Sequence, residues 1–109
     1  MSIDVTTAGV SLTITSVEIA TEYEIASGLY ISVPDNQKVL IIRGTLPGSA
    51  PDGFFDSWTV VDDKGGVAKS SAHKTAGLEV VFLVDKSATS FSLKTGDGQT
   101  IDLTQAMAD

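Results

Sequence analysis

The chain has a single histidine, His73, close to two adjacent serines, Ser70 and Ser71. A serine beside a histidine can supply the nucleophile and the general base of a hydrolase, with an aspartate to orient the imidazole. Hydrolase serines sit in strained turns such as G-x-S-x-G, whereas "KSSAHKTAG" has the polar composition of a strand end. The pattern therefore favours a structural role, and we expect no catalytic residues.

Closely spaced carboxylates suggest a second kind of chemistry, because glycosidases place two carboxyl groups about 5–10 Å apart across a sugar. The pairs with suitable spacing are Glu22 and Glu24, Asp52 and Asp56, and Asp62 and Asp63. With 14 acidic residues in 109, such pairs arise by chance in solvated turns. The sequence therefore predicts a protein that is not an enzyme.

Calcium binding is a better use for these carboxylates. The segments "DDKGG" and "GDGQTID" offer Asp62, Asp63 and Asp97 together with loop carbonyls, and Ca²⁺ prefers such oxygen ligands. Neither segment matches the D-x-[DN]-x-[DN]-G loop. We therefore assign no metal ligand or cofactor, and keep a calcium-dependent or carbohydrate-binding module that uses these loops as an alternative hypothesis.

Aromatic residues on a surface can also bind sugars or proteins, and the candidates are Phe54, Phe55, Trp58, Tyr23 and Tyr30. Phe54 and Trp58 share the parity of Val60 and are expected in the core, since a buried Trp commonly anchors a sandwich. Phe55 has the opposite parity and follows the Pro- and Gly-rich segment "LPGSAPDG". We therefore predict that Phe55 is exposed and helps to form a partner-binding patch.

Charge and composition exclude several classes of function. The formal net charge is -7, and the seven basic residues are spread thinly, so the clustered basic face of a nucleic-acid-binding protein is missing. No apolar run approaches the roughly 20 residues of a membrane helix. Twelve Thr, twelve Ser, one Asn and no Cys give a hydroxyl-rich, disulfide-free chain of the kind often found in exported bacterial β-domains.

The elements that must position these residues are strands, because apolar residues alternate with polar ones. Val10, Leu12 and Ile14 alternate, and the phase then slips near Thr15 and Ser16, which predicts a β-bulge. Further strands are expected at residues 29–33, 38–46, 54–62, 67–72, 78–84, 91–93 and 101–103. Helical patterning is almost absent, and only residues 20–27 and the tail, residues 104–109, could form a helical turn or two.

Two turn signals are strong. "DDKGG" predicts a hairpin turn, and Asp97-Gly98 between alternating strands is the best short hairpin signal that a sequence offers. Seven to eight mostly antiparallel strands over about 100 residues predict an all-β fold, a single two-sheet immunoglobulin-like β-sandwich domain spanning residues 1–109.

The only arginine, Arg43, helps to distinguish the two faces of the sheet. It shares a strand face with Val39, Ile41 and Thr45, whereas Leu40, Ile42 and Leu46 lie on the other face. If the second set faces the core, Arg43 lies on the outer face with its head in water and a cross-strand carboxylate beside it. We predict this structural role for Arg43.

The order of segments carries a resemblance. "VSLTITSVE", "DNQKVLIIRGTL", "FDSWTVVDDKGG" and "GLEVVFLVDKSATSFSLKTGDG" together resemble the bacterial secreted immunoglobulin-like domains of unknown function that are grouped with the mycobacterial immunoprotective extracellular antigen. Residues 39–46 match the long alternating strand of that family, residues 62–66 its Asp-x-x-Gly turn and residues 81–84 its "vFxV" strand. The likeness extends over about residues 9–104. An Asn-rich turn of the family is replaced by "LPGSAPDG", and its lipid-attachment cysteine is missing.

The resemblance implies an exported protein that has no catalytic residues and acts through binding. We therefore expect an extracytoplasmic protein, secreted or lipid-anchored at the cell surface, whose signal peptide lies outside this sequence. Its expected function is that of a non-enzymatic interaction or structural module. We expect an unidentified protein or cell-surface partner, no nucleic acid and no transmembrane segment.

Overall fold

Alternation of apolar and polar residues produces strands throughout the described part of the chain. The computed structural model describes residues 2–7, 9–46, 54–74 and 78–104, with the side chains of residues 72–74 left out. The elements are β1 (Ile3–Thr7), β2 (Val10–Ala20), β3 (Glu24–Ala26), β4 (Leu29–Tyr30), β5 (Gln37–Thr45), the 3-10 helix η1 (Phe54–Ser57), β6 (Thr59–Asp62), β7 (Val67–Lys74), β8 (Leu78–Asp85), β9 (Phe91–Lys94) and β10 (Thr100–Asp102).

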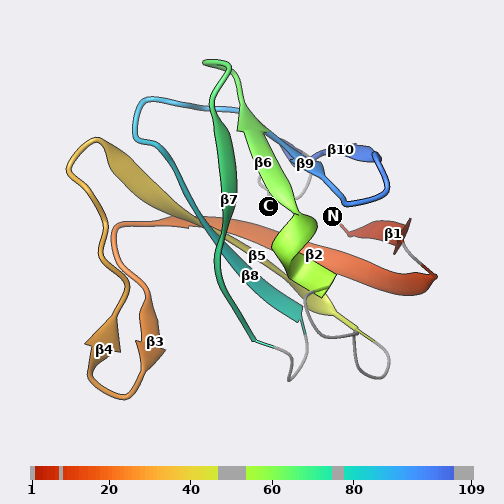
Figure 1. Cartoon of the computed structure of the whole chain (residues 1–109), viewed down its shortest axis with the longest axis horizontal. Coiled ribbons are helices and arrows are strands. Elements are labelled where there is room, and N and C mark those ends of the chain that lie inside the picture. The colour runs from red at the N-terminus through yellow and green to blue at the C-terminus, as the bar shows by residue number, and fades with distance from the viewer. Residues whose placement is uncertain (1, 8, 47–53, 75–77, 105–109) are drawn as a thin grey trace.

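Eight of the strands form one antiparallel sheet in the order β1-β2-β5-β8-β7-β6-β9-β10, and β3 pairs with β4 in a small separate sheet. The large sheet curls until its two edge strands approach each other (Figure 1). Side chains join these edges, because Thr7 Oγ1 donates to Asp97 Oδ1 at 2.7 Å and Gln99 Nε2 donates to the Thr6 carbonyl. The all-β prediction is confirmed, whereas a two-sheet sandwich is a finer description than this arrangement establishes.

The inner face of the curled sheet encloses the main core. Its largest fully buried side chains include Trp58, Phe55, Phe82, Leu40 and Leu93. The strand β8 is buried on both faces, since Val80 and Phe82 join this core while Val81 packs in a second cluster on the outer face. Its two-sided apolar sequence therefore marked a central strand correctly.

The predicted bulge is present in β2. The register of β2 with β5 shifts between Ile14 and Ser16, which carries the inward-facing pattern from Ile14 to Val17. Gly44 lies opposite Ile14, and a Cβ atom at Gly44 would stand 1.9 Å from the Thr13 carbonyl oxygen. A glycine is therefore required where the bulge brings the two backbones together.

The helical turn allowed for at residues 20–27 is wrong, and most of the tail, residues 105–109, lies outside the described part of the chain. The segment at residues 20–27 contains β3, which turns at Gly28 (φ +76°) and pairs with β4. The positive φ permits a tight reversal that most side chains disfavour, so the chain folds back as a hairpin. The strand expected at residues 29–33 is correspondingly short, because only Leu29 and Tyr30 pair.

The prediction that Phe55 is exposed is also wrong, since Phe55 is 1% exposed. Residues 54–57 form η1, and a 3-10 turn does not follow the alternation of a strand. Three aromatic rings pack together in this corner. The centroid of the Phe54 ring lies 5.0 Å from that of Phe55 and 5.8 Å from that of Trp58, and the Phe55 and Trp58 rings meet edge to face at 89°. Trp58 is buried as expected, and Phe54 packs at the edge of the core.

Candidate functional site

Arg43 lies where the sequence predicted, on the outer face of β5 opposite Glu79 of β8. Its Nε lies 2.9 Å from Glu79 Oε1, and its Nη1 lies 3.1 Å from Glu18 Oε1. Burial alone lowers the pKa of Arg43, but the hydrogen bond to Glu79 and the charge of Glu18 outweigh burial and raise the pKa overall. The cross-strand carboxylate neighbour is therefore confirmed, and Arg43 is engaged by this chain's own acids.

The outer face around Arg43 is covered by the chain between β2 and β5. Tyr23, Val39, Ile41 and Val81 form a buried cluster there, with Ile31 among the partly buried residues packed against it. The Tyr23 hydroxyl donates to Glu79 Oε2, so the covering segment is held by both apolar contact and a charged hydrogen bond. This face is thus a second small core with a polar rim.

The hairpin that extends from this segment has no core of its own. We call β3, Gly28 and β4, residues 24–30, the arm; it projects at the lower left of Figure 1. Every residue of its two strands is exposed, including Ile25 (40%), Leu29 (57%) and Tyr30 (52%). An isolated two-stranded hairpin is only marginally stable in water. The arm therefore exposes apolar side chains and strand edges without contributing much stability of its own.

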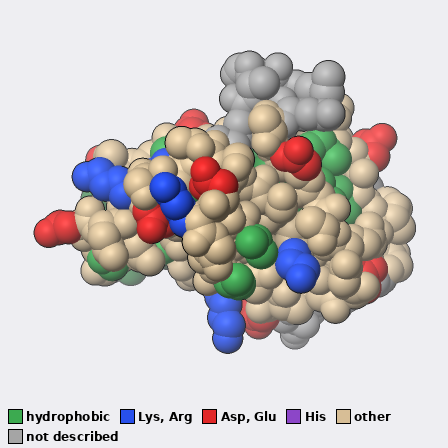
Figure 2. Space-filling view, turned by 90° about the horizontal axis from the view of Figure 1, so that it is seen from above, with side chains coloured by type: hydrophobic (Ala, Val, Ile, Leu, Met, Phe, Trp, Pro, Cys, Tyr) green, Lys and Arg blue, Asp and Glu red, His purple; other side chains and the backbone are tan. Residues whose placement is uncertain are grey.

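Elsewhere the surface is mixed. Figure 2 shows a face on which acidic and basic side chains are interspersed and hydrophobic side chains reach the surface only in small groups. The five large hydrophobic residues that are exposed in the described chain are Ile19, Ile25, Leu29, Tyr30 and Val67. Three of these five lie in the arm, so the exposed large apolar side chains are concentrated there and are not spread evenly over the described surface.

The carboxylates of the calcium hypothesis do not converge. Asp62 pairs with Phe91 at the start of β9, whereas Asp97 lies in the turn beyond Lys94 at the other end of that strand. Asp97 instead accepts hydrogen bonds from Thr7 and Thr95. No group of three or more acidic or histidine side chains in the described residues is arranged to hold a metal ion. The described carboxylates of the two loops therefore do not meet at one site.

The individual carboxylates serve their own turns. Asp62 Oδ1 accepts from the N–H groups of Lys64 at 2.9 Å and Gly66 at 2.8 Å. Asp63 accepts from the Thr89 hydroxyl at 3.0 Å, and this bond, with the Thr89 N–H, lowers its pKa. The Ser87 hydroxyl and N–H likewise lower the pKa of Asp85. These acids stabilise loops.

The serine, histidine and glutamate candidates show no catalytic grouping among the described side chains. Ser70 Oγ donates to the Phe55 carbonyl at 3.0 Å, and Ser71 is exposed. Glu24 Oε2 accepts from Gly28 N–H at 3.0 Å within the arm, and Glu22 is exposed. The side chain of His73, and Asp52 of the pair with Asp56, lie outside the described part of the chain.

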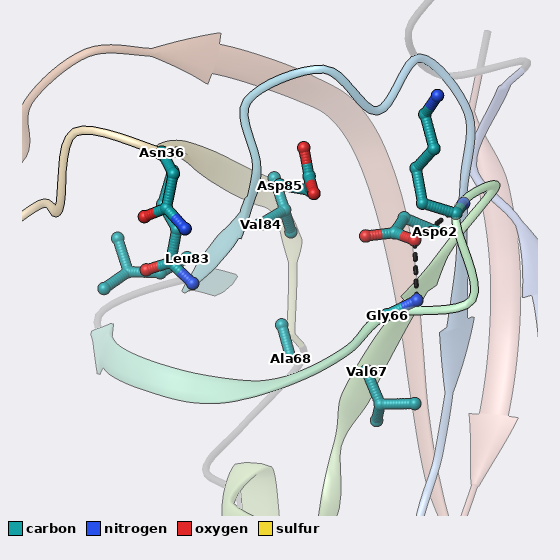
Figure 3. Close-up of a pocket in the computed structure, with 10 residues that line it drawn as sticks. Asn36, Asp62, Gly66, Val67, Ala68, Leu83, Val84 and Asp85 are labelled. Atoms are coloured by element: carbon teal, nitrogen blue, oxygen red, sulfur yellow. Dashed lines mark hydrogen bonds between the residues drawn. The ribbon is translucent and has the colours of Figure 1, made fainter.

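A cavity of about 210 Å³ opens where β7 changes its pairing partner. Residues 67–69 of β7 pair with β6, and β7 pairs with β8 only from Ser70 onward. β7 and β8 therefore separate beside residues 83–85 of β8. We call this cavity the wedge; Figure 3 shows Leu83, Val84 and Asp85 on one side of it and Asp62, Gly66 and Val67 on the other.

The wedge is lined by backbone as well as by side chains. Asp62 N–H donates to Gly66 O at 3.0 Å, so the next pair, Val61 with Val67, is the non-hydrogen-bonded kind. The N–H and C=O of Val67 therefore point away from β6. In the same way, Lys86 N–H donates to Asn36 O, so the N–H of Asp85 points away from β5. Both strands direct polar backbone groups toward the wedge.

Reasoning from the sequence predicted neither the arm nor the wedge. Val67 is 66% exposed and lies at the mouth of the wedge, yet it reads as an ordinary strand residue after a Gly-Gly turn. The available signal was "IASGLY", in which apolar residues surround a Ser-Gly turn and no apolar partner strand is nearby in sequence. Such a signal marks a hairpin and leaves open whether the fold covers it.

The described chain contains no helix with the length and apolar character needed to cross a membrane. No protein-family model, curated protein or solved structure gives a significant match to this sequence. The surfaces that stand out on physical grounds are thus the arm and the wedge, and they carry the functional argument.

Proposed function

We propose that this chain is a non-enzymatic interaction or structural module and that the arm is its contact surface. The observation that carries the proposal is the uncovered hairpin, on which Ile25, Leu29 and Tyr30 are all exposed. Exposed apolar side chains gathered on one element mark protein-binding surfaces, because water contact costs free energy that a partner removes. Tyrosine is also enriched in protein interfaces.

The base of the arm supports this reading. Tyr23 is buried and bonded to Glu79, and Ile31 N–H donates to Tyr23 O at 2.9 Å. A firmly held base presents the tip in a defined position, which reduces the conformational entropy that binding must remove. The arm is therefore suited to recognition.

We also propose an immunoglobulin-like sandwich in an extracytoplasmic protein. The support for the sandwich is the change of partner in β7, which divides the strand order into β1-β2-β5-β8 and β6-β9-β10 around one core. The support for the compartment is the hydroxyl-rich, cysteine-free composition and the family resemblance of the sequence. Fractionation of source cells tests the compartment, and recovery with cytoplasmic marker proteins would contradict it.

Site-specific photo-crosslinking in source cells tests the contact surface. A photoreactive amino acid at Leu29 should give a discrete crosslinked product, because Leu29 is 57% exposed on the arm. The matched control places the same amino acid at Thr100, an exposed residue on edge strand β10. Equal products from both positions, or none from Leu29, would refute the arm as the contact surface.

A further inference from the structure

We propose that the arm of one copy of this chain binds in the wedge of a second copy, which gives a head-to-tail assembly. This inference rests on the proposed function and names the partner as the same chain. It joins the two surfaces that the fold leaves incomplete: a two-stranded hairpin without a covered face, and a gap in the sheet without a strand. Figure 1 places the arm well away from the β6–β7 turn that borders the wedge, so the contact is between copies.

Backbone pairing supplies the first reason. In the arm, β3 and β4 form a sheet of only two strands, so each has an edge without a described strand partner. In the wedge, Val67 and Asp85 direct backbone groups into the gap. The free edge of β4 can therefore add to one side of the gap, as in the strand-addition mode of peptide recognition, while its other edge stays paired with β3. The two residues of β4, Leu29 and Tyr30, match the limited extent of the gap.

Apolar contact supplies the second reason. Val67, Ala68 and Leu83 are apolar residues that line the wedge, and Val67 is the most exposed large hydrophobic residue of the described chain. Leu29 and Tyr30 are the next most exposed. Placing these side chains together removes the largest exposed apolar areas from water in one contact.

Charge distinguishes this contact from an arm-to-arm contact. Residues 1–37 contain no lysine or arginine, and the exposed Glu22 and Glu24 lie just before β3 and at its first position. Two arms in contact would bring these carboxylates together, which opposes association. The wedge instead has mixed charge, because Lys64 lines it together with Asp62 and Asp85 and lies close enough to Asp85 to lower the pKa of that carboxyl. The acidic arm is therefore repelled less by the wedge than by a second arm.

Different surfaces of the two copies meet in this arrangement, so the contact is heterologous and repeats along a ring or an open chain. Sedimentation velocity of the purified protein from micromolar to millimolar concentration tests it. The weight-average mass of the wild type should rise above the 11.3 kDa of one chain as concentration increases. Leu29→Asp and Val67→Asp should each remain monomeric, whereas the matched control Thr100→Asp should assemble like the wild type.

Mixing the two defective variants provides the sharpest test. Leu29→Asp retains an intact wedge and Val67→Asp retains an intact arm, so the mixture should form one contact and stop at a dimer of twice the chain mass. Near-ultraviolet circular dichroism establishes that each variant is folded. If Val67→Asp is unfolded, Val67→Pro replaces it, because proline is tolerated at the first residue of a strand and removes the N–H that faces the wedge.

Three results would overturn the proposal: a wild type that is monomeric at every concentration, a Val67→Asp variant that still assembles, or a mixture that contains only monomers. The proposed function fails separately. If the crosslinker at Leu29 captures a different protein while the pure chain stays monomeric, the arm is a contact surface for that protein and the head-to-tail contact is wrong. If Leu29 gives no crosslink and the chain is monomeric, both are wrong.

Discussion

The aromatic corner at residues 54–58 and the arm at residues 24–30 are both short apolar segments next to a turn, yet the corner is buried and the arm is exposed. In the corner, Phe55 and Trp58 are each 1% exposed and meet edge to face. In the arm, Leu29 and Tyr30 are more than half exposed. The corner lies over the inner face of a curled sheet, whereas no described element covers the arm.

The difference shows that burial here is decided by topology and not by local composition. The Ser70 hydroxyl donates to the Phe55 carbonyl, so β7 fastens the corner from a distant part of the sequence. The corresponding tie for the arm, from Tyr23 to Glu79, acts on the residue before the hairpin and leaves its tip free. The same contrast separates a segment that stabilises the fold from a segment that stays exposed to water.

The largest expected effect is on the corner. Removal of a buried phenylalanine ring commonly costs about 3–5 kcal/mol, so Phe55→Ala should lower the free energy of unfolding by that amount. Leu29→Ala in the arm should change it by less than about 0.5 kcal/mol, because its side chain is already in water. Urea denaturation of the monomeric protein measures both. Equal losses would mean that the arm is packed in solution and would remove the contrast.

A smaller effect is expected from the tie at the base of the arm. Hydrogen bonds to charged groups contribute about 1.5–3 kcal/mol, and Glu79 retains Arg43, so Tyr23→Phe should cost about 1–2 kcal/mol. Amide exchange at Ile31, which donates to Tyr23 O, should also become faster.

Tyr30→Phe is the matched control, since Tyr30 is an exposed tyrosine of the arm itself. It should leave both stability and Ile31 exchange unchanged. If Tyr23→Phe behaves like Tyr30→Phe, apolar contact alone holds the base of the arm, and the charged network around Arg43 has no role there.

The sequence was informative where a residue's environment follows from its immediate neighbours along a strand. The bulge after Ile14, the two-sided burial of β8 and the outer position of Arg43 all follow from alternation. The turn at Asp97-Gly98 follows from the positive φ that glycine accepts, which is +89° at Gly98.

The features that sequence reasoning missed depend on contacts between distant segments. The burial of Phe55 required the 3-10 turn η1, which breaks strand parity, and the separation of Asp62 from Asp97 required knowing that they lie at opposite ends of β9. The wedge required the change of partner within β7. Each is set by which strand pairs with which, and alternation within one strand carries no such information.

The smallest expected effect concerns an exposed carboxylate that ties the β6–β7 turn to the chain before β9. The Thr89 hydroxyl and N–H both donate to Asp63 and lower its pKa from the ordinary value of an aspartate. The stabilisation is therefore fully present above the unfolded pKa and is lost as pH falls through the lower folded pKa. Asp63→Asn should slightly lower the denaturation midpoint at neutral pH and flatten its decline below about pH 4. Thr89→Val should do the same to a lesser extent, because the Thr89 N–H remains a donor to Asp63, and the double variant should add nothing beyond Asp63→Asn. If the denaturation midpoint of Asp63→Asn falls with decreasing pH as steeply as that of the wild type, this bond does not stabilise the folded protein, whereas the aromatic corner does.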